Sequence, residues 1–222
     1  MSYVAVVGSR CLPSIWSCRV DTVVASLLSR GRFVGSGGAV GADLFALCSL
    51  VRRGCSACSG SVVFLPGEPG SAPSSCVSWL SRFVGLGGRV VAGPAPARAS
   101  RRDFVSALFA RSRSLVSGSA GVVAFVSGPS SGTWFTVSCA VEAGLPVVVW
   151  PVSGPSGLRS LGAGRWVPVR SWSGAFRWAS GSYEPTARRE PGFPMFPRCI
   201  HGLVPWMCSF CSCRAVVAEG AI

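Results

Sequence analysis

Short apolar runs recur through the first 150 residues, and most of them end in a turn rich in glycine, serine or proline. Within these runs apolar and polar residues do not alternate, which is typical of strands that are buried on both faces. The pattern predicts six strands, at residues 3–7, 33–34, 61–65, 89–92, 121–126 and 146–150.

Between the runs, apolar residues recur at the i, i+3, i+4 spacing that marks one face of a helix. This spacing predicts helices at residues 18–29, 41–53, 101–114 and 133–143. In the third of them, Phe104, Val105, Leu108 and Phe109 form the predicted buried face. Strands that alternate with helices predict an α/β fold, a Rossmann-like parallel sheet with right-handed crossovers and helices on both faces.

After Trp150 the periodicity weakens, and Pro, Gly, Arg and Trp become frequent. We therefore expect a Rossmann-like domain at residues 1–151 and a small, irregular, cysteine-containing tail at residues 152–222. Loop or small β structure is expected at residues 159–189. Aromatic rings beside arginines can stack on unpaired bases, but packing against the main domain is the favoured interpretation here. The rings concerned are Trp166, Trp172, Trp178 and Trp206.

The tail also holds the single histidine of the chain and a Cys-x-x-Cys pair with the spacing of a zinc knuckle. Four protein ligands would make such a zinc structural, and no other cofactor is predicted. The alternative is chance, because cysteine is frequent throughout the chain and residues 55–58 show the same spacing without a partner pair. The candidate ligands are Cys199, His201, Cys208 and Cys211.

Composition allows one sizeable buried core, since 49% of the 222 residues are hydrophobic and only 13% are charged. The formal net charge is +13, and all 21 basic residues are arginine because lysine is absent, as are asparagine and glutamine. A charge of this size is typical of proteins that bind nucleic acid or another anionic partner. The alternative origin is a coding strand poor in adenine, which would deplete acidic residues and leave arginine in excess.

No basic leader precedes the first apolar run, so we expect no signal peptide and a reducing, cytoplasmic location. The eleven cysteines are then expected as thiols or metal ligands. The uncharged stretch 114–141 is interrupted by Ser, Gly and Pro, which indicates buried strand, loop and helix and no membrane span.

Three turns rich in glycine and serine follow predicted strands, at residues 8–10, 36–41 and 130–133. In a parallel sheet, ligands bind beyond the carboxyl ends of the strands, where glycine allows close approach and helix N–H groups attract anions. The sequence therefore predicts a phosphate site in these turns, although such turns are also common in any chain this rich in glycine and serine. The candidate residues are Gly8, Ser9, Arg10, Ser36, Gly37, Gly38, Ser131, Gly132 and Thr133.

Four segments occur in the order and rough spacing of the DprA/Smf family of DNA-processing proteins, within the SLOG superfamily of Rossmann-like nucleotide-binding domains. They are YVAVVGSR (residues 3–10), SGGAVGAD (36–43), FARSRS (109–114) and GVVAFVSGPSSGTWFTVSCAVEAGLPVVVWP (121–151). The chain resembles this family over residues 3–151. The resemblance implies single-stranded DNA binding and assistance in loading a recombinase.

The resemblance also implies which residues contact phosphate. Arg10 matches the arginine that follows the first Gly-Ser pair, and Arg111 and Arg113 match a basic segment ahead of the fifth strand. Val40 stands where the family has a further arginine. Residues 131–136 resemble the Ser-Gly-x-x-x-Thr turn of the family.

Two other functions stay open. One is a phosphoribohydrolase of the Lonely Guy type, since residues 128–133 resemble the turn of those enzymes, with Asp43 or Glu142 as the required acid. Those enzymes carry a catalytic glutamate soon after the turn, and here Trp134 follows Thr133. Asp43 is instead interpreted as a helix-capping residue beside the nucleotide site, and no catalytic residue is assigned. The other function is a sensor of a small nucleotide signal. A homo-oligomer also stays open.

Overall fold

The computed structural model describes residues 3–96 and 98–180. The predicted zinc ligands Cys199, His201, Cys208 and Cys211 therefore lie outside the described residues, as does Trp206. Among the described residues, no group of three or more His, Cys, Asp and Glu side chains is placed to hold a metal ion.

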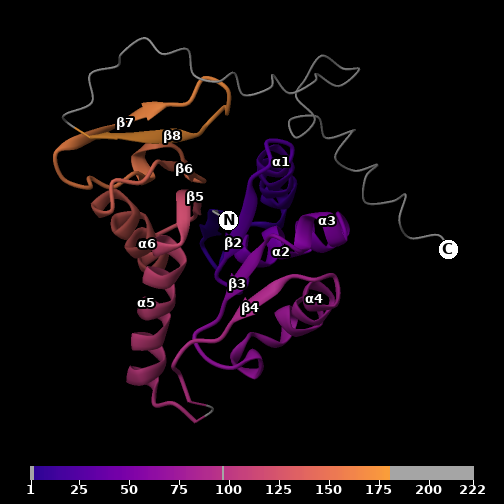
Figure 1. Cartoon of the computed structure of the whole chain (residues 1–222). Coiled ribbons are helices and arrows are strands. Elements are labelled where there is room, and N and C mark those ends of the chain that lie inside the picture. The colour runs from indigo at the N-terminus through magenta and orange to yellow at the C-terminus, as the bar shows by residue number, and fades with distance from the viewer. Residues whose placement is uncertain (1–2, 97, 181–222) are drawn as a thin grey trace.

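The described chain forms one eight-stranded sheet with the strand order β4-β3-β2-β1-β5-β6-β8-β7 (Figure 1). The first six strands in this order run parallel, and the last two add an antiparallel hairpin. All six predicted strands are present, which confirms the Rossmann-like α/β fold. The strands are β1 (Tyr3–Gly8), β2 (Phe33–Ser36), β3 (Val62–Phe64), β4 (Arg89–Val91), β5 (Ser119–Val126), β6 (Val147–Pro151), β7 (Gly164–Pro168) and β8 (Phe176–Ser180).

Helices cover both faces of the sheet, as predicted. Helices α1, α2 and α4 lie on one face of the sheet, and α5 and α6 lie on the other (Figure 1). Their buried side chains form two separate cores with the strands. The helices are α1 (Ser17–Leu28), α2 (Ala42–Arg52), α3 (Cys55–Cys58), α4 (Ser74–Gly85), α5 (Arg101–Ser117) and α6 (Ser131–Glu142), with 3-10 turns at Ser14–Trp16, Pro69–Ser71 and Pro155–Gly157. No helix among the described residues is both long and apolar enough to cross a membrane.

Helix α4 was not predicted, although its residues carry a helical pattern. Its buried residues Cys76, Leu80 and Phe83 recur at the i, i+4, i+7 spacing of one helix face. Val77 and Val84 directly follow Cys76 and Phe83, and both are exposed. The spacing of the buried residues was therefore a signal from which this helix could have been predicted.

The central strand β5 shows why apolar residues run without alternation. Val123 and Phe125 belong to the core on the α1–α2–α4 face, while Val122 and Ala124 belong to the core on the α5–α6 face. Because both faces are covered, neighbouring residues are buried on opposite sides. Burial of a side chain such as Phe125, which is fully inaccessible, contributes about 2–3 kcal/mol to stability.

The hairpin of β7 and β8 continues the sheet beyond Pro151, because β8 pairs antiparallel with β6. Trp172 is buried, with its ring centre 4.9 Å from that of Trp150. Trp166 packs against Trp134 and Trp178. These rings pack against the main domain, in line with the favoured interpretation. The domain boundary near Pro151 stays a prediction.

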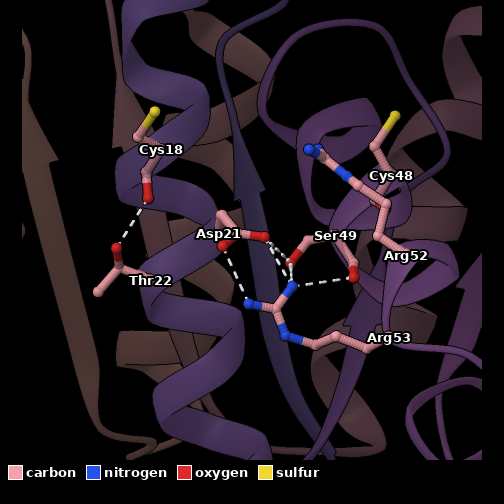
Figure 2. A network of polar contacts seen from close by, with 7 residues as sticks. All are labelled: Cys18, Asp21, Thr22, Cys48, Ser49, Arg52 and Arg53. Carbon is pink, nitrogen blue, oxygen red and sulfur yellow. Dashed lines mark hydrogen bonds and ion pairs between the residues drawn. The ribbon is translucent and has the colours of Figure 1, made fainter. Parts of the chain in front are cut away.

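A polar network joins α1 to α2 on the outside of the sheet (Figure 2). Asp21 of α1 receives two hydrogen bonds from the guanidinium of Arg53, at 2.6 and 2.9 Å, and one from the hydroxyl of Ser49 at 2.7 Å. Burial alone would raise the pKa of Asp21, but the hydrogen bonds and the charge of Arg53 outweigh it and lower the pKa.

Candidate functional site

The centre of the sheet contains a topological switch point between β1 and β5. From β1 the chain proceeds outward through β2, β3 and β4, and it then returns to β5 on the other side. In open α/β sheets, ligands bind in the crevice outside the carboxyl ends of the strands at such a point. A ligand site is therefore expected at the turns after β1 and β5.

Ser9 fastens these two turns together. Its hydroxyl donates to the carbonyl oxygen of Ser127 at 3.0 Å and accepts from the N–H of Ser127 at 2.8 Å. Ser9 is also buried, so its hydroxyl is engaged within the protein. The role of Ser9 in this structure is to hold the turns together.

Two glycines allow the turns to approach one another. A Cβ on Gly8 would overlap the carbonyl oxygen of Phe125 and the side chain of Ala42. A Cβ on Gly41 would overlap the carbonyl oxygen of Ser9, and Gly41 also has a φ of +79°, which side chains rarely tolerate. Close approach of backbone segments therefore explains glycine at both positions.

A pocket of about 550 Å³ opens beyond these strand ends. The turns after β1 and β5 and the start of α6 contribute small polar groups, and one side of α5 contributes apolar groups. Of the predicted residues, the pocket wall includes Gly8, Ser9, Arg10, Asp43, Arg111, Ser131, Gly132 and Thr133. The three separate stretches of sequence thus meet at one cavity, large enough for a small ligand or a nucleotide unit.

The start of α6 offers backbone donors to this pocket. The N–H groups of Thr133 and Trp134 both donate to the carbonyl oxygen of Ser130, at 3.1 Å. The hydroxyls of Ser130 and Thr133 lie 2.8 Å apart and bond to each other. The N–H groups of Ser131 and Gly132, which have no intrahelical partner at a helix start, remain for a ligand. The helix dipole favours an anion at this position.

Arg111 contributes a positive charge at the pocket wall and is held in place by the second turn. Its Nη1 donates to the carbonyl oxygen of Gly37 and lies 3.8 Å from Oδ2 of Asp43. Only 12% of its side chain is exposed. Burial lowers the pKa of Arg111 from its usual value, although the charge of Asp43 opposes that effect.

Asp43 closes the second turn from within. Its Oδ2 accepts a hydrogen bond from the N–H of Ala39 at 3.3 Å, so a carboxylate of the protein occupies the position predicted for a ligand anion. Burial raises the pKa of Asp43 to about 6, although the charge of Arg111 and the Ala39 hydrogen bond oppose the rise. The buried carboxylate braces the turn and is poorly placed to reach a bound substrate.

Four predicted residues lie outside the pocket wall. Ser36 is buried and its hydroxyl donates to the backbone oxygen of Asp43 at 3.5 Å. Gly37 and Gly38 lie behind the pocket, where a Cβ would overlap Arg111 and crowd Leu65 respectively. These three residues shape the second turn from behind.

Arg113 is the fourth and is an exposed residue of α5. Its guanidinium lies 5.1 Å from the ring centre of Phe135. Residues two positions apart on a helix point in nearly opposite directions, so Arg111 and Arg113 do not face the same side. The structure therefore separates two arginines that lie together in the sequence.

The apolar side of the pocket is a correction to the sequence analysis. Val105 and Phe109 belong to the predicted buried face of α5, yet they are 42% and 37% exposed and form part of the pocket wall with Leu108. The spacing predicts a helix face, but it does not predict whether protein or solvent lies against that face. Glu142, the other acid considered for catalysis, is exposed at the opposite end of α6.

Comparison with known proteins points to one family. The family model of DNA recombination-mediator protein A matches residues 1–164. The solved structure of DNA processing protein A from Helicobacter pylori, described for its single-stranded DNA binding mode, has a TM-score of 0.52 and 19% identity, and the match covers 67% of this chain and 64% of that chain.

The structure of DNA processing protein A from Streptococcus pneumoniae has a TM-score of 0.52 and 23% identity, and the match covers 71% of this chain and 53% of that chain. This chain therefore spans less than two thirds of the length of either structure. A search of curated proteins returned no significant match. At these identities the structural likeness shows a shared fold.

Proposed function

The chain belongs to the family of DNA recombination-mediator protein A, and on that premise we propose that its pocket binds the phosphates of single-stranded DNA in DNA processing or recombination. The observation that carries the proposal is the meeting of the β1 turn, the start of α6, Arg10 and Arg111 at one cavity beyond the switch point. Arg10 is exposed, so it can reach a phosphate directly, while Arg111 supplies charge from the pocket wall.

An apolar wall beside phosphate-binding groups supports a single strand as the ligand. The bases of a single strand are unpaired and can lie against apolar or aromatic side chains, whereas those of a duplex are stacked inside it. Val105 and Phe109 provide such a surface next to the anion-binding turns. The Helicobacter pylori protein of the same fold is described as binding single-stranded DNA.

Titration with fluorescent oligo-dT at several salt concentrations tests the proposal. The logarithm of the association constant should fall linearly with the logarithm of the salt concentration, with a slope of about −0.7 for each phosphate contact. Binding that is absent or independent of salt would contradict the proposal. Release of a base from nucleoside monophosphates would instead favour a phosphoribohydrolase, and tight binding of a mononucleotide alone would favour a nucleotide sensor.

Arg10→Ala is the sharpest substitution, because Arg10 is exposed and the change leaves the core intact. We expect about tenfold weaker binding at low salt and a slope reduced by about 0.7, the value of one phosphate contact. Arg32→Ala is the matched control. Arg32 is also exposed, but it precedes β2 and therefore lies at the amino-terminal ends of the strands, away from the pocket. Equal affinities for the two variants would remove Arg10 from the site.

A recombinase partner, a homo-oligomer, a cytoplasmic location and zinc at Cys199, His201, Cys208 and Cys211 all stay predictions. Metal analysis of the protein purified without added zinc addresses the last of these.

A further inference from the structure

Arg159, in the loop between β6 and β7, contacts the turn after β5. Nη2 of Arg159 donates to the carbonyl oxygen of Pro129 at 2.7 Å. The guanidinium of Arg159 also lies 5.6 Å from the ring centre of Trp134, which is buried beneath it. Pro129 is part of the pocket wall and Arg159 is not. The arginine therefore contacts a residue of the wall from outside the pocket.

The backbone of Arg159 is anchored in turn by the hairpin. Its carbonyl oxygen accepts a hydrogen bond from the indole N–H of Trp166 in β7, at 2.8 Å. Trp166 packs edge-on against Trp134 and Trp178, at ring-centre distances of 6.2 and 5.1 Å. A continuous set of contacts thus runs from β7 through Arg159 to the turn.

The direction of one carbonyl group matters for anion binding. A trans peptide is planar, so its C=O and its following N–H point in opposite directions, and the described chain holds no cis peptide. Because the Pro129 carbonyl oxygen points toward Arg159, the N–H of Ser130 in the same peptide points away from Arg159. The same contact keeps a partially negative oxygen away from a phosphate. The adjoining Gly128 has a φ of +64°, so the backbone would be pliable without such a contact.

We propose that Arg159 is a positioning residue for single-stranded DNA, which orients the Pro129–Ser130 peptide and contacts no phosphate itself. This inference rests on the proposed function of the pocket. It assigns the hairpin of β7 and β8 a role in ligand binding through the turn after β5.

Salt dependence separates positioning from direct contact. We expect Arg159→Ala to weaken binding of fluorescent oligo-dT about fivefold, the effect of one hydrogen bond, with an unchanged salt slope. Arg159→Lys, which keeps a donor, should restore part of the affinity. Arg165→Ala removes a nearby exposed arginine of β7 and is the matched control, with less than about a twofold effect. Unchanged affinity in Arg159→Ala, or a slope reduced by about 0.7, would overturn the proposal.

Two further measurements test the effect of Arg159 on the turn separately from DNA binding. Amide hydrogen exchange over residues 127–133 should speed up in Arg159→Ala, with no change in the urea midpoint, whether or not DNA binds. Trp166→Phe keeps a ring but removes the N–H, so it should act in the same direction and not additively with Arg159→Ala. Unchanged exchange, or additive effects, would contradict the inference, whereas absence of DNA binding by the wild-type protein would contradict only the function of the pocket.

Discussion

Asp43 and Arg111 form a buried pair of opposite charges at the pocket wall, 3.8 Å apart. At neutral pH the carboxylate offsets part of the positive charge that a phosphate would meet. Its pKa is raised to about 6 by burial, so acidification through that value removes the negative charge while leaving the guanidinium charged. The folded state also retains this proton to higher pH than the unfolded chain, so the contribution of Asp43 to stability falls as pH rises between about 4 and 6.

We predict that affinity for oligo-dT rises about fivefold as pH falls from 7.5 to 5, because protonation of Asp43 removes its repulsion of the phosphate. Fluorescence titration at constant salt measures the change. In Asp43→Asn the rise should be absent, since the side chain no longer titrates, and urea unfolding should establish that the variant is folded. A rise that persists in Asp43→Asn would assign the pH dependence to another group.

Between elements, the Asp21 network links the first two helices on the α1–α2–α4 side of the sheet (Figure 2). Both Nη atoms of Arg53 donate hydrogen bonds to the carboxylate of Asp21. Such bidentate pairs are stronger than ion pairs with a single contact. The network is still about one third exposed, so solvent screens it. The pKa of Asp21 is lower in the folded protein than in the unfolded chain. The network therefore stabilises the fold at pH values above the unfolded pKa of Asp21, and this stabilisation is lost as pH falls through the folded pKa.

We therefore expect Asp21→Asn to reduce the free energy of unfolding at pH 7 by about 1 kcal/mol or less. The difference from the wild-type protein should shrink as pH falls below about 4, where Asp21 of the unfolded chain gains a proton, and it should disappear below the lowered pKa of the folded state. Urea unfolding at pH 7 and at pH 3 measures both values. Arg53→Lys keeps the charge but loses the bidentate geometry, so its free energy of unfolding at pH 7 should lie between those of the wild-type protein and Asp21→Asn. A difference that is the same at both pH values would show that the ion pair contributes nothing.

Across the whole molecule, three aromatic rings connect the centre of the sheet to the hairpin. Phe125 of β5 stacks on Trp150 of β6 with ring centres 5.0 Å apart, and Trp150 contacts Trp172 at 4.9 Å. The indole N–H of Trp150 also donates to the carbonyl oxygen of Ser173 at 3.2 Å. Together with the pairing of β8 to β6, these contacts predict that residues up to 180 unfold together with the parallel sheet.

Trp172→Ala should accordingly lower the free energy of unfolding of the whole domain by about 3 kcal/mol, the cost of removing a large buried ring. Tryptophan fluorescence and far-ultraviolet circular dichroism should report one coincident transition in urea. Arg170→Ala, an exposed substitution nearby, should change stability by less than about 0.5 kcal/mol. Two separate transitions would instead support a domain boundary near Pro151.

Local patterns in the sequence were sufficient to predict the six parallel strands, helices α1, α2, α5 and α6, and the turns that follow β1 and β5. Those features depend on neighbouring residues, because burial on two faces and helical spacing both leave a short-range record. The sequence did not reveal that Asp43 would occupy its own turn, that Arg111 and Arg113 would face different ways, or that Phe109 would be exposed at the pocket. Nor did it show that β8 would pair with β6.

Each of those outcomes is set by contacts between residues distant in the chain. The Gly37 oxygen that holds Arg111 comes 74 residues earlier, and Ser9 meets Ser127 across 118 residues. Such long-range contacts determine which polar groups are hydrogen-bonded inside the protein and which remain for a ligand. The amino-acid sequence by itself determined the elements and the glycines that permit a phosphate site, and the tertiary structure alone decided which charges face it.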